Sequence, residues 1–347
     1  MLEKPRLVRG LEFIMSAVAQ RGTARKLDHV RIGVIGVGVM GANHARVLAE
    51  LPHVELIGLA DPDRSHALRV TKLLGCQAVA DHKTLIGLGI DAAVIAAPTH
   101  LHHAIALDCI AAGINVLVEK PIASSVEEGR AIVAAARHAG VTLMVGHVER
   151  FNPSVQALKQ ALVGEDILSI AITRVGPFPP RMSNVGVVID LAVHDIDLIR
   201  WFTESDIVEV QPQLSNVRAA REDIALLQFR TASGVLAHIN TNWLTPFKAR
   251  TVHIATRDKY IIADLLTRQV TECFGFQEDG SYSMWHLSVG HAEPLRAELI
   301  AFLEAVRKGG AAAVSGEEGV ASLEIAIRCL NGSHAAAARK PVRRVAG

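Results

Sequence analysis

The sequence Gly36-Val37-Gly38-Val39-Met40-Gly41 places glycines at the spacing G-x-G-x-x-G. It follows an apolar run at 31–35 and precedes an amphipathic stretch at 40–51, so it joins a predicted strand to a predicted helix. The first glycine permits a tight turn, the second lets the backbone approach a pyrophosphate, and the third lets helix and strand pack closely. The helix start adds free N–H groups for the phosphates. A glycine-rich turn without a ligand is the alternative, which the strand–turn–helix context disfavours.

Asp61 stands at the end of the second predicted strand, 54–60, and follows Gly41 by 20 residues. A carboxylate at this place accepts hydrogen bonds from the adenosine ribose and repels a 2′-phosphate, so it predicts NAD rather than NADP as cofactor. Two other interpretations stay open. Asp61-Pro62-Asp63 is also typical of a turn that caps the next helix, and Arg64 could meet a phosphate.

Lys120, Asp190 and His194 have side chains suited to moving a proton. Glu119 and Lys120 lie at the carboxyl end of a predicted central strand, where ligands bind in open α/β sheets, so both are expected to contact the cofactor. The bond from Lys120 to Pro121 could be cis. On a helix that starts near Asp190, positions 190, 194 and 197 share one face. The alternatives are a loop lysine, a helix N-cap at Asp190 and a buried histidine at 194, or a metal site, for which no further ligands are present.

The stretch Ala97-Pro98-Thr99, with His100, His102 and His103 after it, lies at another predicted strand-to-helix turn. The three histidines resemble metal ligands, but they do not share a helix face, so no metal site is predicted. We expect this turn, including His102, to line the nicotinamide side of the cofactor site.

Alternating short strands and amphipathic helices predict a parallel sheet in the first half of the chain. The second half changes to consecutive strands, which predict a mostly antiparallel sheet. The fold class is therefore α/β, with a Rossmann domain at 30–147, a substrate-binding and oligomerisation domain at 148–347, and an N-terminal extension at 1–29 in which Met15 could be the true start. The predicted strands are 31–35, 54–60, 92–96, 115–118, 142–145, 169–175, 208–217, 224–231, 234–241, 251–255, 260–263 and 269–273, and the predicted helices are 40–51, 63–74, 102–112, 126–139, 190–202, 294–308 and 316–330.

The composition excludes several classes of protein. A formal net charge of +1 leaves no overall field for nucleic acid or for an anionic membrane surface. The apolar runs are too short to span a bilayer, so a soluble protein is expected. The four cysteines are scattered, which is typical of a reducing compartment and predicts a cytoplasmic location.

Five motifs occur in an order that resembles the glucose-fructose oxidoreductase/inositol dehydrogenase (Gfo/Idh/MocA) family: GVGVMGANHARVL at 36–48, ADPD at 60–63, APTHLHHAIA at 97–106, GINVLVEKPIA at 113–123 and DLAVHDIDL at 190–198. The resemblance extends from about residue 29 to residue 335. It implies NAD as cofactor, an open-faced C-terminal sheet that mediates a homodimer or homotetramer, and a catalytic set of Lys120, Asp190 and His194.

A narrower resemblance, to the branch of the family that oxidises UDP-linked amino sugars, is carried by GHVERFNP at 146–153, RVGPFPPR at 174–181 and NWLTPFKAR at 242–250. It implies a UDP-sugar substrate oxidised at its 3-hydroxyl, and a downstream aminotransferase on the route to lipid A precursors. The side chains expected to bind the substrate, beside the catalytic set, are Arg150, Asn152, Arg174, Arg181, Lys248 and Arg250. Each of these cations could instead lie in a salt bridge.

The chemistry that follows is oxidation of a ring hydroxyl, with hydride transfer to NAD⁺. His194 is the expected base, Lys120 would stabilise the developing alkoxide, and Asp190 would orient the substrate and balance charge. Two alternatives remain: a dehydrogenase of another sugar or polyol, of the inositol type, and a regulator that binds NAD(H) without turnover.

Overall fold

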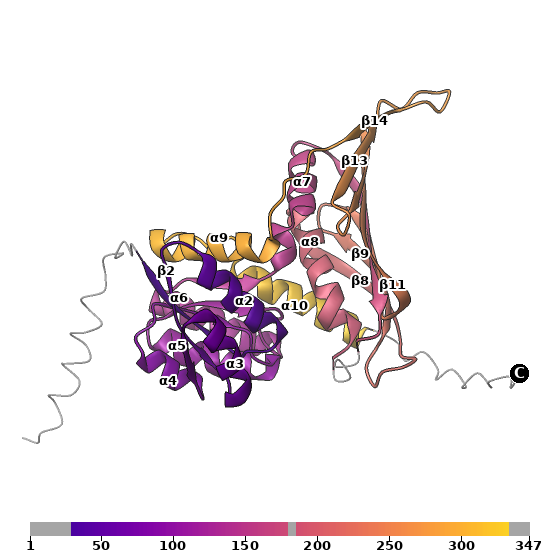
Figure 1. The fold of residues 1–347 in the computed structure, drawn as a ribbon. Helices are drawn as coiled ribbons and strands as arrows, with labels where there is room; N and C mark the ends of the chain where they lie inside the picture. Colours follow the sequence, from indigo (N-terminus) through magenta and orange to yellow (C-terminus); the bar gives the residue numbers. More distant parts are fainter. Residues whose placement is uncertain (1–28, 180–184, 333–347) are drawn as a thin grey trace, which may run out of the picture.

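The computed structural model describes residues 29–179 and 185–332, which form two sheets with their helices (Figure 1). The first sheet has six parallel strands in the order β3-β2-β1-β4-β5-β6. Its strands are β1 (Val30–Ile35), β2 (Val54–Ala60), β3 (Gln77–Val79), β4 (Ala92–Ile95), β5 (Asn115–Glu119) and β6 (Leu143–Gly146). Its helices are α2 (Val39–Glu50), α3 (Arg64–Leu74), α4 (His82–Gly87), α5 (Thr99–Ala111) and α6 (Val126–Ala139). Every residue of β4 is buried, as expected for a strand covered on both faces.

The second sheet has eight strands in the order β14-β13-β12-β11-β7-β10-β9-β8, and all pairs are antiparallel except β7 with β10. Its strands are β7 (Ile167–Pro177), β8 (Ile207–Ser215), β9 (Ile224–Thr231), β10 (Leu236–Asn242), β11 (Leu244–Thr256), β12 (Lys259–Asp264), β13 (Gln269–Phe274) and β14 (Ser283–His286). The helical elements are η1 (Val148–Phe151), α7 (Pro153–Ala161), the π-helical turn η2 (Val188–Ala192), α8 (Val193–Thr203), α9 (Pro294–Lys308) and α10 (Gly316–Asn331).

One face of the second sheet is packed and the other is open. Helices α7, α8 and α10 lie on the same side of it (Figure 1). In β9 buried and exposed residues alternate, so that Leu227 is fully buried while Leu226 is 50% exposed. Leu236 of β10 and Ile262 of β12 are also exposed, which leaves apolar surface on the open face.

The last two helices return to the first sheet. Leu299 and Phe302 of α9 belong to the same buried cluster as the parallel strands, whereas Ala326 near the end of α10 belongs to the cluster of the second sheet. The N–H of Val145 in β6 also donates to the carbonyl of Val314, at 3.1 Å. Residues after 290, which follow the second sheet in the chain, therefore help to complete the core of the first sheet.

The predicted fold class is confirmed: a parallel Rossmann sheet is followed by a mostly antiparallel sheet. The sequence patterns missed the short elements β3, α4, α7 and β14, since three to nine residues give too few positions to reveal a period. Helix α5 also begins at Thr99, so the predicted start at residue 102 was wrong. Among the described residues, no helix is both long and apolar enough to span a membrane.

Candidate active site

The glycine-rich loop between β1 and α2 is built for close backbone contact. Gly36 has φ +87°, and a Cβ placed there would lie 2.6 Å from the backbone nitrogen of Ala97. A Cβ on Gly41 would lie 1.8 Å from the carbonyl oxygen of Gly36, so helix and loop can pack only without a side chain. A Cβ on Gly38 would meet nothing within 4 Å, which leaves room for a ligand at the middle glycine.

The start of α2 is suited to an anion. Its N-cap is Gly38, which has no side chain to bind the first N–H groups of the helix. Val39 and Met40 are 70% and 38% exposed, although both are apolar. Free N–H groups at a helix start, next to an open glycine and exposed apolar side chains, fit the pyrophosphate of a dinucleotide.

Asp61 lies beside this loop. Its carboxylate accepts hydrogen bonds from the N–H of Val37, at 2.7 Å, and from the N–H of Asp63, at 2.8 Å. The helix cap predicted as an alternative role belongs to Asp63, which accepts from the N–H of His66 at 3.0 Å. Arg64 is exposed at the start of α3. The carboxylate of Asp61 is thus held at the edge of the loop, where a ribose would lie.

Lys120 and Asp190 are in direct contact across the two sheets. The ammonium of Lys120, which is 16% exposed, donates to the backbone oxygen of Asp190 at 2.7 Å and to its carboxylate at 3.3 Å. Lys120 follows the last residue of β5, and its peptide bond to Pro121 is cis. The contact places one ammonium and one carboxylate at the carboxyl edge of the parallel sheet.

Asp190 and His194 stand on one continuous helical segment whose first turn is η2. Such a turn is wider than an α-helical one because it closes i→i+5 hydrogen bonds, so it changes the spacing around Asp190, whereas positions 194 and 197 lie on the regular helix α8. Asp190 and His194 are partly exposed, whereas Asp197 is 1% exposed and points into the protein.

The imidazole of His194 lies in a cationic environment. Burial of the ring lowers its pKa well below the usual value, and the charges of Lys120 and Arg174 lower it further. The shift favours the neutral ring, which is the form that can accept a proton. Its Nδ1 is buried without a hydrogen-bond partner among the described residues.

Comparison with known proteins identifies the fold and the cofactor. Residues 30–147 match the model described as "Oxidoreductase family, NAD-binding Rossmann fold", and residues 168–261 match the "GFO/IDH/MocA C-terminal domain". UDP-N-acetylglucosamine 3-dehydrogenase of Acidithiobacillus ferrooxidans is 32% identical over 69% of this chain and 75% of that protein. This chain belongs to the GFO/IDH/MocA oxidoreductase family. It is an NAD-dependent dehydrogenase, and its glycine loop and Asp61 fit the cofactor.

Two kinds of GFO/IDH/MocA relative are similar to this chain. A crystal structure of the Acidithiobacillus enzyme has a TM-score of 0.83 at 28% identity, covering 88% of this chain and 97% of that one. Inositol 2-dehydrogenase 1 of Saccharopolyspora erythraea is 32% identical over 87% of this chain and 93% of that protein. A myo-inositol dehydrogenase from Corynebacterium glutamicum has a TM-score of 0.74 at 26% identity, covering 88% and 96%. The similarities therefore include both nucleotide-sugar and inositol dehydrogenases.

Two predicted cofactor contacts have a different role in this structure. Both ring nitrogens of His102 face backbone oxygens, those of Pro121 at 3.0 Å and Ala97 at 2.8 Å, and the residue is 1% exposed. Its side chain does not line the nicotinamide side; it fixes the turn after Lys120 against α5. Ala97, Pro98 and Thr99 remain at the loop edge, with Pro98 exposed.

Glu119 also turns away from the cofactor side. Its carboxylate meets Nε2 of His44 in α2 at 2.7 Å and accepts from the N–H of Lys120 at 3.2 Å. Burial alone would raise the pKa of Glu119, but the hydrogen bond and charge of His44 and the charge of Lys120 hold it below the usual value. Glu119 is thus a charged support for the strand end that positions Lys120.

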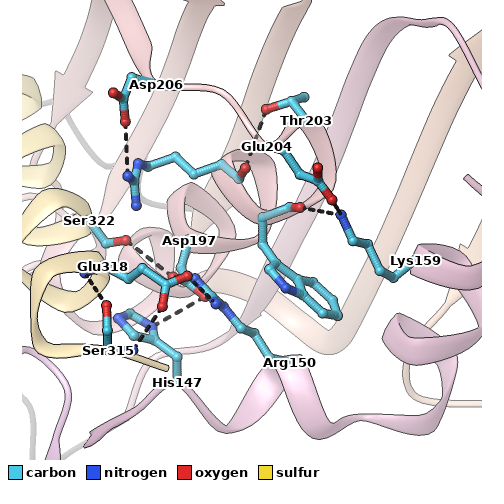
Figure 2. A network of polar contacts seen from close by, with 12 residues as sticks. His147, Arg150, Lys159, Asp197, Thr203, Glu204, Asp206, Ser315, Glu318 and Ser322 are labelled. Carbon is cyan, nitrogen blue, oxygen red and sulfur yellow. Dashed lines mark hydrogen bonds and ion pairs between the residues drawn. The ribbon is translucent and has the colours of Figure 1, made fainter. Parts of the chain in front are cut away.

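Two arginines expected to bind substrate lie in buried ion pairs instead. Arg150, 3% exposed, makes two 2.7 Å hydrogen bonds to Asp197 and one of 2.6 Å to Glu318 (Figure 2). Arg174, also 3% exposed, contacts Asp195 at 2.7 Å and Glu149 at 2.8 Å. Guanidinium groups bound to two carboxylates are not available for a diphosphate.

The remaining expected substrate contacts differ in exposure. Asn152 is buried, where it caps α7 by accepting from the N–H of Ser154 at 3.0 Å, so it does not meet a substrate. Arg250 is partly exposed and pairs with Glu149 at 3.1 Å. Lys248 is exposed and has no ion pair within the described ranges. Arg181 lies outside the described residues.

Proposed function

We propose that this dehydrogenase oxidises the 3-hydroxyl of a UDP-linked amino sugar, with UDP-N-acetylglucosamine as the first substrate to test. The observation that supports it is similarity to UDP-N-acetylglucosamine 3-dehydrogenase both in sequence and in structure, with a TM-score of 0.83 against 0.74 for the inositol enzyme. The 3-keto product would suit an aminotransferase that builds a lipid A precursor in the cytoplasm.

The chemistry rests on Lys120, Asp190 and His194. NAD⁺, when bound, accepts the hydride from the carbon that carries the hydroxyl. Neutral His194 takes the hydroxyl proton, so the C–H and O–H bonds break and a carbonyl forms. The ammonium of Lys120 donates a hydrogen bond to the same oxygen as negative charge develops on it. Asp190 holds that ammonium in place and offsets its charge.

A diphosphate would be bound by cations of β11. Lys248 is exposed there, and Arg250, two residues on, is partly exposed. The charge of Arg250 acts on the pKa of His194, so its guanidinium lies near the reacting groups. Arg150 and Arg174 stabilise this region through buried ion pairs with α8, the helix that carries His194, and do not contact the substrate.

A substrate panel tests the proposal. Absorbance of NADH would be followed with UDP-N-acetylglucosamine, other UDP-sugars, myo-inositol and scyllo-inositol. We expect turnover of UDP-N-acetylglucosamine, and a KM for it that rises about tenfold in Lys248→Met, the usual effect of one lost charged contact. Turnover of an inositol with no turnover of any UDP-sugar would support the second candidate, an inositol dehydrogenase, which the similar identity of the Saccharopolyspora relative favours.

A further inference from the structure

His147 lies at the active site, although the sequence predicted no role for it beyond its place in the motif GHVERFNP. It follows β6 directly, and Gly146 of β6 pairs with Glu119 of the parallel strand β5. Since His147 and Lys120 each follow a residue of that pair, they leave the sheet at the same edge. His147 is 1% exposed, so it lies beneath the reacting groups rather than on the surface.

The ring of His147 packs against that of His194. The centroids are 6.2 Å apart and the ring planes are at 85°, an edge-to-face contact. Nδ1 of each ring is buried without a hydrogen-bond partner among the described residues. The protein thus holds two imidazoles together, and each has a nitrogen free to take a proton.

The two rings differ in the charges around them. Nδ1 of His147 is 3.8 Å from a carboxylate oxygen of Asp197, which Arg150 and Ser322 hold in place (Figure 2). The other charged groups that act on His147 are Arg150, Lys120, Glu119 and, through ring contact, His194. The groups with the largest effect on His194 are cationic or basic: Lys120, Arg174, His147 and Arg250, while the nearby carboxylate of Asp190 is engaged by Lys120.

These surroundings favour protonation of His147 before His194. Burial lowers the pKa of both histidines. At His147 the charges of Arg150 and Lys120 lower it further, but those of Asp197 and Glu119 oppose the shift; at His194 the charges of Lys120 and Arg174 add to the shift, and its pKa lies well below the usual value. An imidazolium at position 147 would have an anionic partner, and once formed its charge would oppose a second proton on the adjoining ring.

We propose that His147 is a positioning residue that protects the base: as pH falls, it takes a proton ahead of His194, pairs with Asp197, and keeps His194 neutral. The proposal rests on the assignment of His194 as base in the proposed function. Protonation of His147 would thereby extend to lower pH the range over which His194 can accept a proton from the substrate.

The first test is the pH profile of kcat/KM, measured with the best substrate of the panel. His147→Phe keeps a ring against His194 but removes the group that takes the proton. We expect its acidic limb to move toward neutral pH, so that the ratio of kcat/KM at about pH 8.5 to that at about pH 5 rises roughly three- to tenfold over wild type. His138→Phe, on the exposed side of α6, is the matched control and should leave the ratio unchanged.

The second test needs no turnover. NMR of histidine-labelled protein, assigned with His147→Phe and His194→Ala, should show His147 titrating at a higher pH than His194. Titration of His194 first, or an acidic limb that stays in place or moves to lower pH in a folded, NAD-binding His147→Phe enzyme, would overturn the proposal. Failure of the sugar assignment alone would leave the NMR order intact, so the two failures are distinguishable.

Discussion

The ammonium group of Lys120, which follows β5 of the first sheet, contacts Asp190 in the turn η2, which packs against the second sheet. The Nζ atom of Lys120 donates to the backbone oxygen of Asp190 at 2.7 Å and to its carboxylate at 3.3 Å. Lys120 is fixed by β5 and Asp190 by the wide turn η2, so the geometry of the site depends on the docking of both halves. In the proposed mechanism, a substrate hydroxyl that enters the site would compete for this ammonium.

Replacement of Lys120 should separate chemistry from cofactor binding. Lys120→Met removes the donor to the reacting oxygen, and we expect turnover to fall by ~10²–10⁴-fold, the usual worth of such a group, while NAD affinity changes little. Lys83→Met, at an exposed lysine on α4, is the control. Turnover by NADH absorbance and NAD titration by fluorescence would be compared. Loss of NAD binding together with turnover would mean that Lys120 is structural.

Asp61 should decide between NAD and NADP. The wild type should bind NAD more tightly, because the carboxylate repels a 2′-phosphate. Asp61→Asn keeps an acceptor for the N–H of Val37 and removes the charge, so NADP affinity should rise about tenfold relative to NAD. Asp63→Asn, two residues away and exposed, should leave the preference unchanged. Equal affinity of the wild type for both cofactors would remove the role given to Asp61.

The parts of the site that the sequence could predict are those with local causes. The loop from Gly36 to Gly41 and the position of Asp61 depend on a strand, a turn and a helix that are contiguous in the chain. Lys120 follows from the rule that strand ends of a parallel sheet share one edge. For these residues a short window of sequence contains the physical reason for their place.

The parts that could not be predicted depend on partners far along the chain. Arg150 pairs with Asp197 and Glu318, 47 and 168 residues away, and Arg174 pairs with Glu149 and Asp195. A single sequence shows that the arginines lie in motifs typical of substrate binding. It does not show that their guanidinium groups are already paired with carboxylates. The same holds for His147, whose proposed role depends on its contact with the ring of His194.

Because Arg174 is buried in ion pairs, its replacement should lower the free energy of unfolding of the protein. Arg174→Met would leave Asp195 without its cation in the interior and Glu149 with Arg250 alone, and breaking a buried pair costs about 3–5 kcal/mol. Lys248→Met, at an exposed lysine, should leave the free energy of unfolding within about 0.5 kcal/mol of wild type. Urea unfolding would measure both. A stable Arg174→Met protein with a raised KM would restore the substrate-binding role.

The open face of the second sheet predicts assembly. Leu226, Leu236 and Ile262 are exposed there, and a monomer would leave this apolar surface in water. We expect a homodimer or homotetramer, which Leu226→Asp combined with Ile262→Asp should weaken at least tenfold, whereas the single change Leu73→Asp on exposed α3 should not. Light scattering across micromolar concentrations would show it. A monomeric wild type would contradict this prediction.

Glu298 predicts how stability depends on pH. This residue of α9 is fully buried, and neither carboxylate oxygen has a hydrogen-bond partner among the described residues. Burial, and then the charge of Glu119, raise the pKa of Glu298 well above its usual value, so the folded protein holds a proton that the unfolded chain releases. Because the folded pKa is the higher one, the stabilising effect is complete below the unfolded pKa and is lost as pH rises through the folded pKa.

The neutral variant Glu298→Gln should remove that dependence. Its Tm should be close to that of wild type at about pH 5, and should exceed it by a growing margin as pH rises toward about 8, since the amide has no proton to lose. Glu304→Gln, an exposed residue of the same helix that pairs with Lys308, should show no such trend. Thermal unfolding across this pH range would decide. A Tm difference for Glu298→Gln that stays constant with pH would show that Glu298 is ionised in the folded protein, which would contradict this prediction.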